Sequence, residues 1–285
     1  MSSEANFIQY PYGLTEKPTC CDVLEKKPTS KIQSAKLHAS FSLVIPAYNE
    51  EKRIRPFLEH IESELPLEWE IIIVADGDDR TADIAKSFGN RFTVYEYGHK
   101  LGKGGAILEG FKKANGEVIG YVDADGALKA SEILRVFNGV NNDSPVAIGS
   151  RWVNGSRILT KQPVLRVILG RLYHYVTFAF LGIKQKDTQC GLKAYRKELI
   201  HEIIGKLTLT NLSIDTAIIY HCKLLNQKIL EVPVSWQDIG GSKFHPLKSA
   251  IVMFGTVVGL RIVHGVKSQR IRKKISELHE IVKTI

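Results

Sequence analysis

The stretch EVIGYVDADG, residues 117–126, is the part of the chain from which the fold can be argued most directly. Its apolar residues up to Val122 are typical of a buried strand in a parallel sheet. Two acids, Asp123 and Asp125, follow at the end of that strand, on either side of Ala124. A turn needs only one such acid, to cap the next helix, whereas paired carboxylates at a strand end can also bind a hard divalent cation. The two acids on their own leave both interpretations open.

The pattern of an apolar run followed by a helical segment repeats on both sides of this stretch. Such alternation with short connections predicts an α/β domain with a mostly parallel sheet, helices on both faces and right-handed crossovers. Ligands of such sheets bind at the carboxyl ends of the strands, where the motifs PAYNE (46–50) and DGDD (76–79) also fall. The predicted strands are 41–46, 70–76, 92–97, 117–123 and 146–150, and the predicted helices are 50–64, 81–89, 102–114 and 131–140.

The alternation stops after Arg151, and two long apolar stretches follow, at 163–183 and 247–263. Each carries a few basic residues, which is typical of helices that lie in a membrane interface. Their length also fits core helices, and the two together fit a re-entrant hairpin. No run of 18 or more uncharged apolar residues occurs, so no confident membrane span is expected. Between and after them we expect a helix at 213–225, a strand at 229–236 and a basic amphipathic helix at 267–281.

Composition limits the classes of partner. The formal net charge of +9 suits phosphorylated ligands, an anionic membrane surface or nucleic acid. No nucleic-acid reader motif or cluster of aromatic platforms is present, so a nucleic-acid partner is not expected. The four cysteines form no CxxC pair, which argues against zinc and for reduced thiols. Residues 1–40 lack the apolar core of a signal peptide and are expected to form a flexible extension.

Three further features suit anionic ligands. The stretch HKLGKGGAILEG (99–110) combines close glycines with a helix start, although it matches neither a Walker A loop nor GxGxxG. Lys243, in a glycine-flanked loop, and Arg151, after the fifth strand, are basic residues suited to phosphate. Each feature alone also fits a glycine turn or a solvated basic side chain.

Taken together, the motifs resemble the family 2 glycosyltransferases, which have the GT-A fold. Within that family the resemblance is strongest to the polyprenyl-phosphate sugar synthases, first the dolichyl-phosphate β-glucosyltransferases and next the dolichol-phosphate mannose synthases. About 200 residues carry it, in the family's order. The motifs are SLVIPAYNEE (42–51), VADGDDRT (74–81), GKGGAILEGF (102–111), VDADGA (122–127), IGSR (148–151), DTQCGLKAYR (187–196) and VPVSWQDIGGSK (232–243).

The resemblance implies roles for individual residues. Asp123 and Asp125 would be the DxD pair that binds Mg²⁺ or Mn²⁺, with Asp125 the more direct ligand. The sugar and the acceptor phosphate would be bordered by Arg151, Asp187, Gln189 and Lys243. The nucleotide pocket would be lined by Pro46, Tyr48, Glu50, Asp76, Lys103 and Ala124 beside the DxD pair.

The chain also departs from the family's pattern. Ala75 stands where the usual aspartate pair has its first acid, and Ala217 stands where the glucosyl branch often has a further acid. Ala127 replaces a glutamine that is frequent in the mannose synthases, which favours glucose. The first transmembrane helix of the membrane-bound eukaryotic glucosyl enzymes has no counterpart in the sequence.

The resemblance therefore predicts an inverting hexosyltransferase. It would move glucose from UDP-glucose, or mannose from GDP-mannose as the alternative, to a polyprenyl (dolichyl) phosphate. The expected location is cytoplasmic, peripherally bound to the cytoplasmic face of a membrane. A polyprenyl phosphate is largely ionised at neutral pH, so no side chain is expected to serve as an essential base. The expected division is an extension at 1–40, a catalytic domain at 41–243 with an interfacial helix at 163–183, and a membrane-associating segment at 244–285.

Two rival functions stay open from the sequence. A family 2 transferase that uses a soluble sugar or a glycan end would be active without lipid phosphate. A catalytically silent protein that only binds nucleotide sugars is the other rival. The intact Asp123, Asp125 and Lys243 argue against the silent protein.

Overall fold

The structure, a computed structural model, describes residues 40–160, 162–207, 213–240 and 246–265, all within the compact unit His38–Ile285. The predicted extension at 1–40, apart from its last residue, the predicted helix at 267–281 and Lys243 lie outside the described residues. The predictions made for those segments stay predictions.

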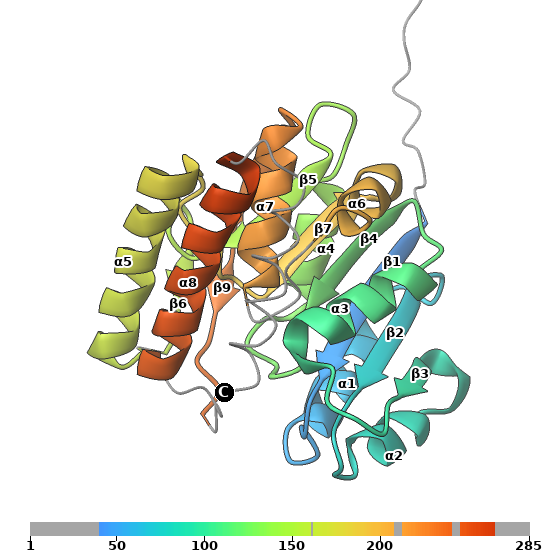
Figure 1. The fold of residues 1–285 in the computed structure, drawn as a ribbon. Coiled ribbons are helices and arrows are strands. Elements are labelled where there is room, and N and C mark those ends of the chain that lie inside the picture. The colour runs from blue at the N-terminus through green and yellow to red at the C-terminus, as the bar shows by residue number, and fades with distance from the viewer. Residues whose placement is uncertain (1–39, 161, 208–212, 241–245, 266–285) are drawn as a thin grey trace, which may run out of the picture. The chain divides into compact units, whose positions relative to one another are not determined.

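A seven-stranded sheet forms the centre of the domain, in the order β3-β2-β1-β4-β7-β5-β8 (Figure 1). All its neighbours pair in parallel except at β7, which runs antiparallel to both β4 and β5. The predicted mostly parallel sheet is therefore confirmed. Its strands are β1 (Phe41–Ala47), β2 (Glu70–Ala75), β3 (Thr93–Glu96), β4 (Val118–Val122), β5 (Val146–Ser150), β7 (Leu192–Arg196) and β8 (Ile229–Pro233).

Helices cover both faces of this sheet, as predicted. One face packs on an apolar cluster that includes Leu58, Ala85 and Ile133, and the other on a cluster that includes Ile107 and Ile218. A short 3₁₀ turn, η1 (Gly89–Arg91), precedes β3. The first face carries α1 (Ile54–Glu64), α2 (Thr81–Lys86) and α4 (Ala130–Asn138), and the second carries α3 (Gly102–Lys113), α6 (Lys197–Ile204) and α7 (Ile214–Leu224).

The parallel register brings three strand ends to one edge. Ala47 pairs with Ala75 at the ends of β1 and β2, while Val44 pairs with Tyr121 of β4. The loops that follow these strands therefore emerge side by side, and Asp123 begins one of them. On the other side of β4, Val122 pairs with Leu192, so β7 brings the chain just before it to the same edge.

Two predicted elements differ in detail. The single strand expected at 229–236 is divided at Val234: β8 joins the main sheet, while β9 (Ser235–Trp236) pairs with β6 (Arg157–Ile158) in a separate two-stranded sheet. The helix expected from residue 50 begins at Ile54, and before it the backbone N–H groups of Glu50 and Glu51 donate to the side chains of Thr81 and Asp79.

The two long apolar stretches form α5 (Val164–Leu181) and α8 (Pro246–Gly265), which lie side by side (Figure 1). The inner side of α8 packs into the domain through Val257 and Leu260. By length and composition alone α5 could cross a membrane, yet only 17% of it is buried, so it is not a core helix. Its buried positions are Tyr173, Thr177 and Leu181, and its most exposed apolar residues are Val164, Leu165, Ile168, Leu172, Tyr175 and Phe178.

Candidate active site

The loop after β4 carries two acids, Asp123 and Asp125, and is called the DxD loop below. Its entry is fixed because the Asp123 N–H donates to the Gly191 carbonyl at 2.9 Å. Asp125 Oδ1 accepts the Ala127 N–H at 3.0 Å, so this acid does shape a turn. Burial raises the pKa of Asp125, and the neighbouring charge of Asp123 raises it further. The two carboxylates therefore repel each other, and a bound cation would relieve that repulsion.

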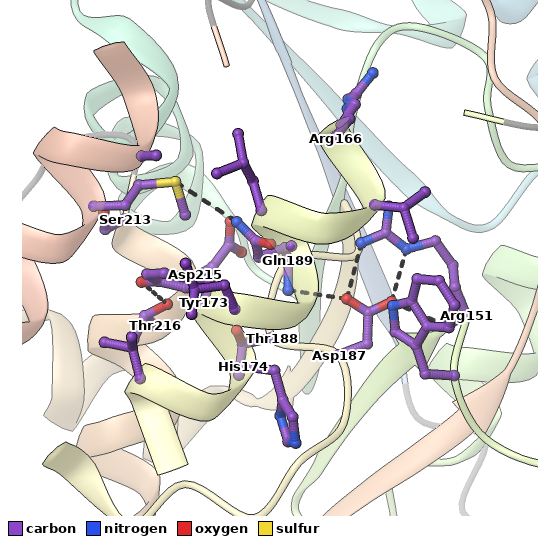
Figure 2. A pocket seen from close by; sticks show the side chains of 18 of the residues that line it. Arg151, Arg166, Tyr173, His174, Asp187, Thr188, Gln189, Ser213, Asp215 and Thr216 are labelled. Atoms are coloured by element: carbon purple, nitrogen blue, oxygen red, sulfur yellow. Dashed lines mark hydrogen bonds and ion pairs between the residues drawn. The ribbon is translucent and has the colours of Figure 1, made fainter. Parts of the chain in front are cut away.

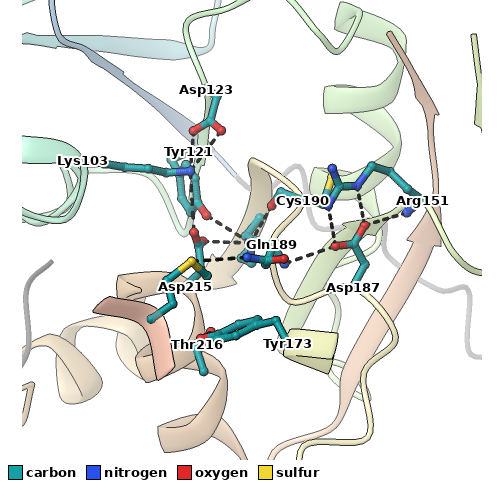
Figure 3. Close-up of polar contacts among 12 residues, drawn as sticks. Lys103, Tyr121, Asp123, Arg151, Tyr173, Asp187, Gln189, Cys190, Asp215 and Thr216 are labelled. Carbon is teal, nitrogen blue, oxygen red and sulfur yellow. Dashed lines mark hydrogen bonds and ion pairs between the residues drawn. The ribbon is translucent and has the colours of Figure 1, made fainter. Parts of the chain in front are cut away.

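Lys103, at the start of α3, is the cation that faces Asp123 (Figure 3). Its Nζ lies 2.7 Å from Asp123 Oδ1 and 3.0 Å from Asp123 Oδ2. A second carboxylate, Asp215 Oδ2 on α7, lies 3.6 Å from the same Nζ. Burial alone lowers the pKa of Lys103, but Asp123, Asp215 and then Asp125 together raise it above its ordinary value. Lys103 is therefore held as an ammonium beside the acids.

Beneath this ammonium is a buried ion pair that the sequence did not predict. Lys193 on β7 is wholly buried, and its Nζ lies 2.8 Å from Asp215 Oδ1. The same Nζ donates to the Cys190 carbonyl at 2.6 Å and to the Tyr121 hydroxyl at 3.1 Å. Burial raises the pKa of Asp215 to about 6 and lowers that of Lys193 to about 7. Lys193, Asp215, Lys103 and Asp123 form a lysine–aspartate chain from the core to the DxD loop.

Arg151 and Asp187 form a second buried pair (Figure 2). Arg151 Nε donates to Asp187 Oδ2 at 2.7 Å, Arg151 Nη2 donates to Asp187 Oδ1 at 2.9 Å, and the Arg151 backbone N–H donates to Oδ2 at 3.0 Å. Burial by itself would raise the pKa of Asp187, but the charge and hydrogen bonds of Arg151 hold it below its ordinary value. Asp187 therefore orients the guanidinium and is poorly suited to take up a proton.

Both sets of charges line one cavity of about 310 Å³. Lys103, Asp123 and Asp125 lie in its wall together with Arg151 and Asp187. The cavity continues between the two apolar helices, so a polar end and an apolar end share one space (Figure 2). Its lining from the rest of the chain includes Trp152, Arg166, Val167, Leu169, Leu172, Tyr173, His174, Val176, Lys186, Gln189, Asp215, Ala250, Met253 and Phe254.

The other residues predicted for the nucleotide pocket, Pro46, Tyr48, Glu50, Asp76 and Ala124, are not part of the lining of this cavity. Asp76 is buried, and its Oδ2 accepts the N–H groups of Leu101 and Gly102 at 2.8 and 2.7 Å. Its other oxygen, Oδ1, is buried without a hydrogen-bond partner among the described residues, and burial raises the pKa of the carboxyl. An acceptor atom in this state is suited to a ligand N–H group.

The remaining predicted nucleotide residues fall around Asp76. Pro46 pairs with Val74 at the ends of β1 and β2, and Lys100 Nζ lies 4.3 Å from the centroid of the Tyr48 ring. Glu50 is paired with Arg53 at 2.7 Å, so it is committed to a neighbour within its own loop. Ala124 is buried in the core and supplies shape only.

Six of the predicted residues therefore line one cavity: Lys103, Asp123, Asp125, Arg151, Asp187 and Gln189. The Gln189 amide Nε2 lies 3.6 Å from Met253 Sδ. The sequence assigned no role to Tyr173 and Asp215, which also line the cavity, or to Lys193, which contacts Asp215. The one sequence signal for Lys193 is its position inside the apolar run LKAY. A lysine is normally exposed to solvent, so a lysine within an apolar strand is unusual.

The donor atoms fit a hard divalent cation that also binds a ligand. Asp123 and Asp125 offer carboxylate oxygens within one loop, and Asp125 is destabilised as an anion by its neighbour. No group of three or more His, Cys, Asp or Glu side chains suited to a metal occurs in the described part of the chain. Mg²⁺ is commonly held by one or two carboxylates plus phosphate oxygens and water, which matches this donor set.

Solved structures with the same architecture are glycosyltransferases. Glucosyl-3-phosphoglycerate synthase from Mycobacterium tuberculosis, in complex with Mn²⁺, UDP and glucosyl-3-phosphoglycerate, matches with a TM-score of 0.59 at 16% identity, over 86% of this chain and 88% of that one. Mannosyl-3-phosphoglycerate synthase from Rubrobacter xylanophilus matches with a TM-score of 0.58 at 17% identity, over 81% and 76%. These likenesses establish the GT-A fold, as the sequence predicted.

Relatives with higher sequence identity to this chain indicate the glycosyltransferase family to which it belongs. The Dictyostelium discoideum dolichyl-phosphate β-glucosyltransferase is 33% identical over 241 residues, which cover 77% of this chain and 73% of that protein. The Saccharomyces cerevisiae enzyme of the same name is 30% identical over 260 residues, covering 82% and 77%. Residues 42–204, more than half of the chain, match the family described as Glycosyl transferase family 2. The motifs, the sheet and these matches agree, and the chain belongs to glycosyl transferase family 2.

Proposed function

We propose that this chain transfers glucose from UDP-glucose to a polyprenyl phosphate, with inversion at the anomeric carbon. One observation carries the proposal: a single cavity joins the DxD loop and a buried Arg151–Asp187 pair to an apolar passage between α5 and α8. A sugar diphosphate needs the first part, and a phosphate on a long hydrocarbon needs the second. The relatives named as dolichyl-phosphate β-glucosyltransferases support the same substrates.

In the proposed reaction, an acceptor phosphate oxygen forms a bond to the anomeric carbon as the bond to the UDP oxygen breaks. A divalent cation, Mg²⁺ or Mn²⁺, held by Asp123 and Asp125 would supply positive charge to the leaving diphosphate. Lys103 adds an ammonium on the same side. Arg151 and Asp187 both lie in the cavity wall. Asp187 orients the Arg151 guanidinium, which would bind the acceptor phosphate.

No side chain needs to remove a proton in this reaction. The acceptor phosphate has a second pKa of about 6 and is largely ionised at neutral pH. Asp187 is engaged by Arg151, and Asp215 is engaged by two lysines. These carboxylates therefore act by orienting cations rather than as bases, which agrees with the sequence-based hypothesis.

Donor and acceptor can be identified in one assay. The full chain is offered radiolabelled UDP-glucose, UDP-GlcNAc or GDP-mannose together with a polyprenyl phosphate, with and without EDTA. We expect label in the organic phase from UDP-glucose only, lost with EDTA and lost in Asp125→Ala. Label from GDP-mannose instead would support the mannose alternative, and transfer that ignores the lipid phosphate would support a soluble or glycan acceptor.

The exposed stripe of α5 is proposed to bind the cytoplasmic face of a membrane. Leu165, Ile168, Leu172 and Tyr175 follow one another at spacings of three and four residues and are each more than half exposed. The opposite side of α5 is anchored to the domain through Tyr173. A helix held on its inner side and apolar on its outer side suits the plane of the interface rather than a span.

A vesicle flotation assay tests this placement. The double variant Leu165→Glu/Ile168→Glu changes two exposed residues outside the cavity lining, and it is expected to stop floating with liposomes that carry the wild-type protein upward. The matched control is Leu67→Glu, which places the same charge at an apolar residue that is 80% exposed elsewhere on the domain. Flotation of the α5 variant at the wild-type level would contradict the placement. In this proposal residues 41–243 form the catalytic domain, 163–183 the interfacial insertion and 244–285 the membrane-associating segment.

A further inference from the structure

The position of Lys103 raises a conflict over the DxD loop. Its ammonium contacts both oxygens of Asp123, at 2.7 and 3.0 Å (Figure 3). A divalent cation at Asp123 and Asp125 would need at least one of those oxygens. Two cations on the same carboxylate repel each other strongly in a partly buried site. Lys103 must therefore give up part of its contact when a metal binds.

A second acceptor for this ammonium is already in place. Asp215 Oδ2 lies 3.6 Å from Lys103 Nζ, and a charge-assisted hydrogen bond of this kind is about 2.8 Å long. The side chain of Asp215 is 8% exposed, compared with 34% for Asp123, so little water competes for it. A movement of less than about 1 Å along a flexible lysine side chain would complete the new bond.

Lys193 explains why Asp215 is held ready for this role. It is wholly buried and contacts Asp215 Oδ1 at 2.8 Å, while its other bonds to Cys190 and Tyr121 fix its own position. Asp215 Oδ1 is thereby in ion-pair contact with Lys193, although it accepts no hydrogen bond among the described residues, and Oδ2 is the oxygen that faces Lys103. Lys193 is carried by β7, so its place is set by the sheet.

We propose that Asp215 is an alternative ion-pair partner of the Lys103 ammonium. A divalent cation that binds Asp123 and Asp125 displaces Lys103 toward Asp215, which Lys193 holds in position. Asp215 and Lys193 are thus positioning residues for cation binding, since they act through Lys103. The inference rests on the proposed function, because it takes Asp123 and Asp125 to be the metal-binding pair. It predicts an energetic coupling between residues 103 and 215.

Mn²⁺ binding by the full chain measures that coupling without any turnover. Calorimetric or electron paramagnetic resonance titrations are run without nucleotide and again at saturating UDP. In Asp215→Asn the Kd for Mn²⁺ should rise about tenfold, because the displaced Lys103 ammonium has no second carboxylate with which to pair. In Lys103→Met the Kd should fall, since the competitor is gone. The double variant Lys103→Met/Asp215→Asn should bind like Lys103→Met, within about twofold.

The controls separate this proposal from a purely structural ion pair and from the metal proposal. Glu132→Gln neutralises another buried carboxylate, on α4, and should leave the Kd for Mn²⁺ unchanged. A folded Asp215→Asn with the wild-type Kd overturns the inference while leaving the metal site intact. If Asp215→Asn does not fold, a Lys103→Met variant with unchanged or weaker Mn²⁺ binding overturns it instead. Absence of Mn²⁺ binding by the wild type in both media overturns the metal pair and this inference together.

Discussion

At the residue scale, Gly191 shows how closely the chain packs around the DxD loop. Its carbonyl accepts the Asp123 N–H, and a Cβ at this position would lie 2.0 Å from Asp123 Oδ2. Any larger residue must therefore push the Asp123 carboxylate away from its present place. The glycine of the motif DTQCG is needed for the close approach of two segments far apart in the sequence.

We expect Gly191→Ala to lower kcat/KM for glucose transfer about 100-fold, because a shift of about 1 Å in a reacting group costs that much. The measurement is steady-state transfer at saturating lipid phosphate. Gly98→Ala is the control, since a Cβ there meets no atom within 4 Å. Near-wild-type kinetics in Gly191→Ala would show that the position of Asp123 is not critical.

The Arg151–Asp187 pair should separate stability from activity. Asp187→Asn leaves the buried guanidinium without its counter-charge and should lower the free energy of unfolding by about 3 kcal/mol. Replacing both residues, in Arg151→Met/Asp187→Leu, should recover most of that loss while transfer stays abolished. Urea unfolding and the transfer assay measure the two effects. Recovery of transfer in the double variant would exclude a direct role for the guanidinium.

The sequence pointed to Asp123, Asp125 and Arg151 as candidate site residues because they lie just after apolar strands. It could not locate the contact between Arg151 and Asp187, which joins two segments 36 residues apart through the antiparallel strand β7. The burial of Lys193 could not be predicted from the sequence, for a different reason. A charged residue in a strand is normally exposed, and only its three-dimensional surroundings show that its bonds are satisfied in the core.

At the element scale, a buried tyrosine on α5 makes a polar contact with α7. The hydroxyls of Tyr173 and Thr216 are hydrogen-bonded at 2.8 Å, and both side chains are buried. Burial raises the pKa of Tyr173 to about 12, so the phenol stays neutral and able to donate.

Tyr173→Phe keeps the ring but removes this bond, and should lower the free energy of unfolding by about 1 kcal/mol. Tyr175→Phe, two residues along on the exposed side of α5, should leave it unchanged. Denaturant unfolding of the two variants side by side gives the comparison. Equal stabilities would mean that apolar packing alone holds the helix.

Some helices and strands could be predicted from the sequence and others could not. The five strands of the parallel pattern were predicted within a few residues, because each is a continuous apolar run closed by polar residues. Neither β7 nor α6 was predicted, since LKAYR has a lysine as its second residue and α6 spans only eight residues. The division of the strand at Val234 depends on a partner, Arg157–Ile158, that has no signal of its own.

At the scale of the whole molecule, stability should depend on the protonation of buried His221 in mild acid. His221 is buried on α7, and its Nδ1–H donates to the Ala217 carbonyl at 2.8 Å. Burial lowers the pKa of His221 below its ordinary value of 6.5. The unfolded chain therefore takes up a proton at this position at a higher pH than the folded chain does. Between the two pKa values, a fall in pH favours the unfolded state.

We expect His221 to contribute a decrease in the free energy of unfolding as the pH falls from about 7.5 to about 5, by at most about 1.4 kcal/mol per pH unit, while Asp215, with its raised pKa, contributes in the opposite direction. His221→Gln removes the titrating ring and should make the decrease shallower. Chemical denaturation across this range measures both slopes. Parallel slopes for the variant and the wild type would assign the acid sensitivity to other groups.

The antiparallel strand β7 also has a consequence for the order in which the protein matures during synthesis. The first four strands, β1 to β4, can pair as soon as residue 122 is available. In contrast, β5 meets β4 only through β7, which is made later, and the bond that fixes Asp123 waits for Gly191. A chain cut before residue 187 should therefore fail to bind Mn²⁺ and UDP, as titration of such a fragment would show. On the ribosome, the strands around the donor site are laid down early, yet the nascent enzyme stays inactive until its second half has been made.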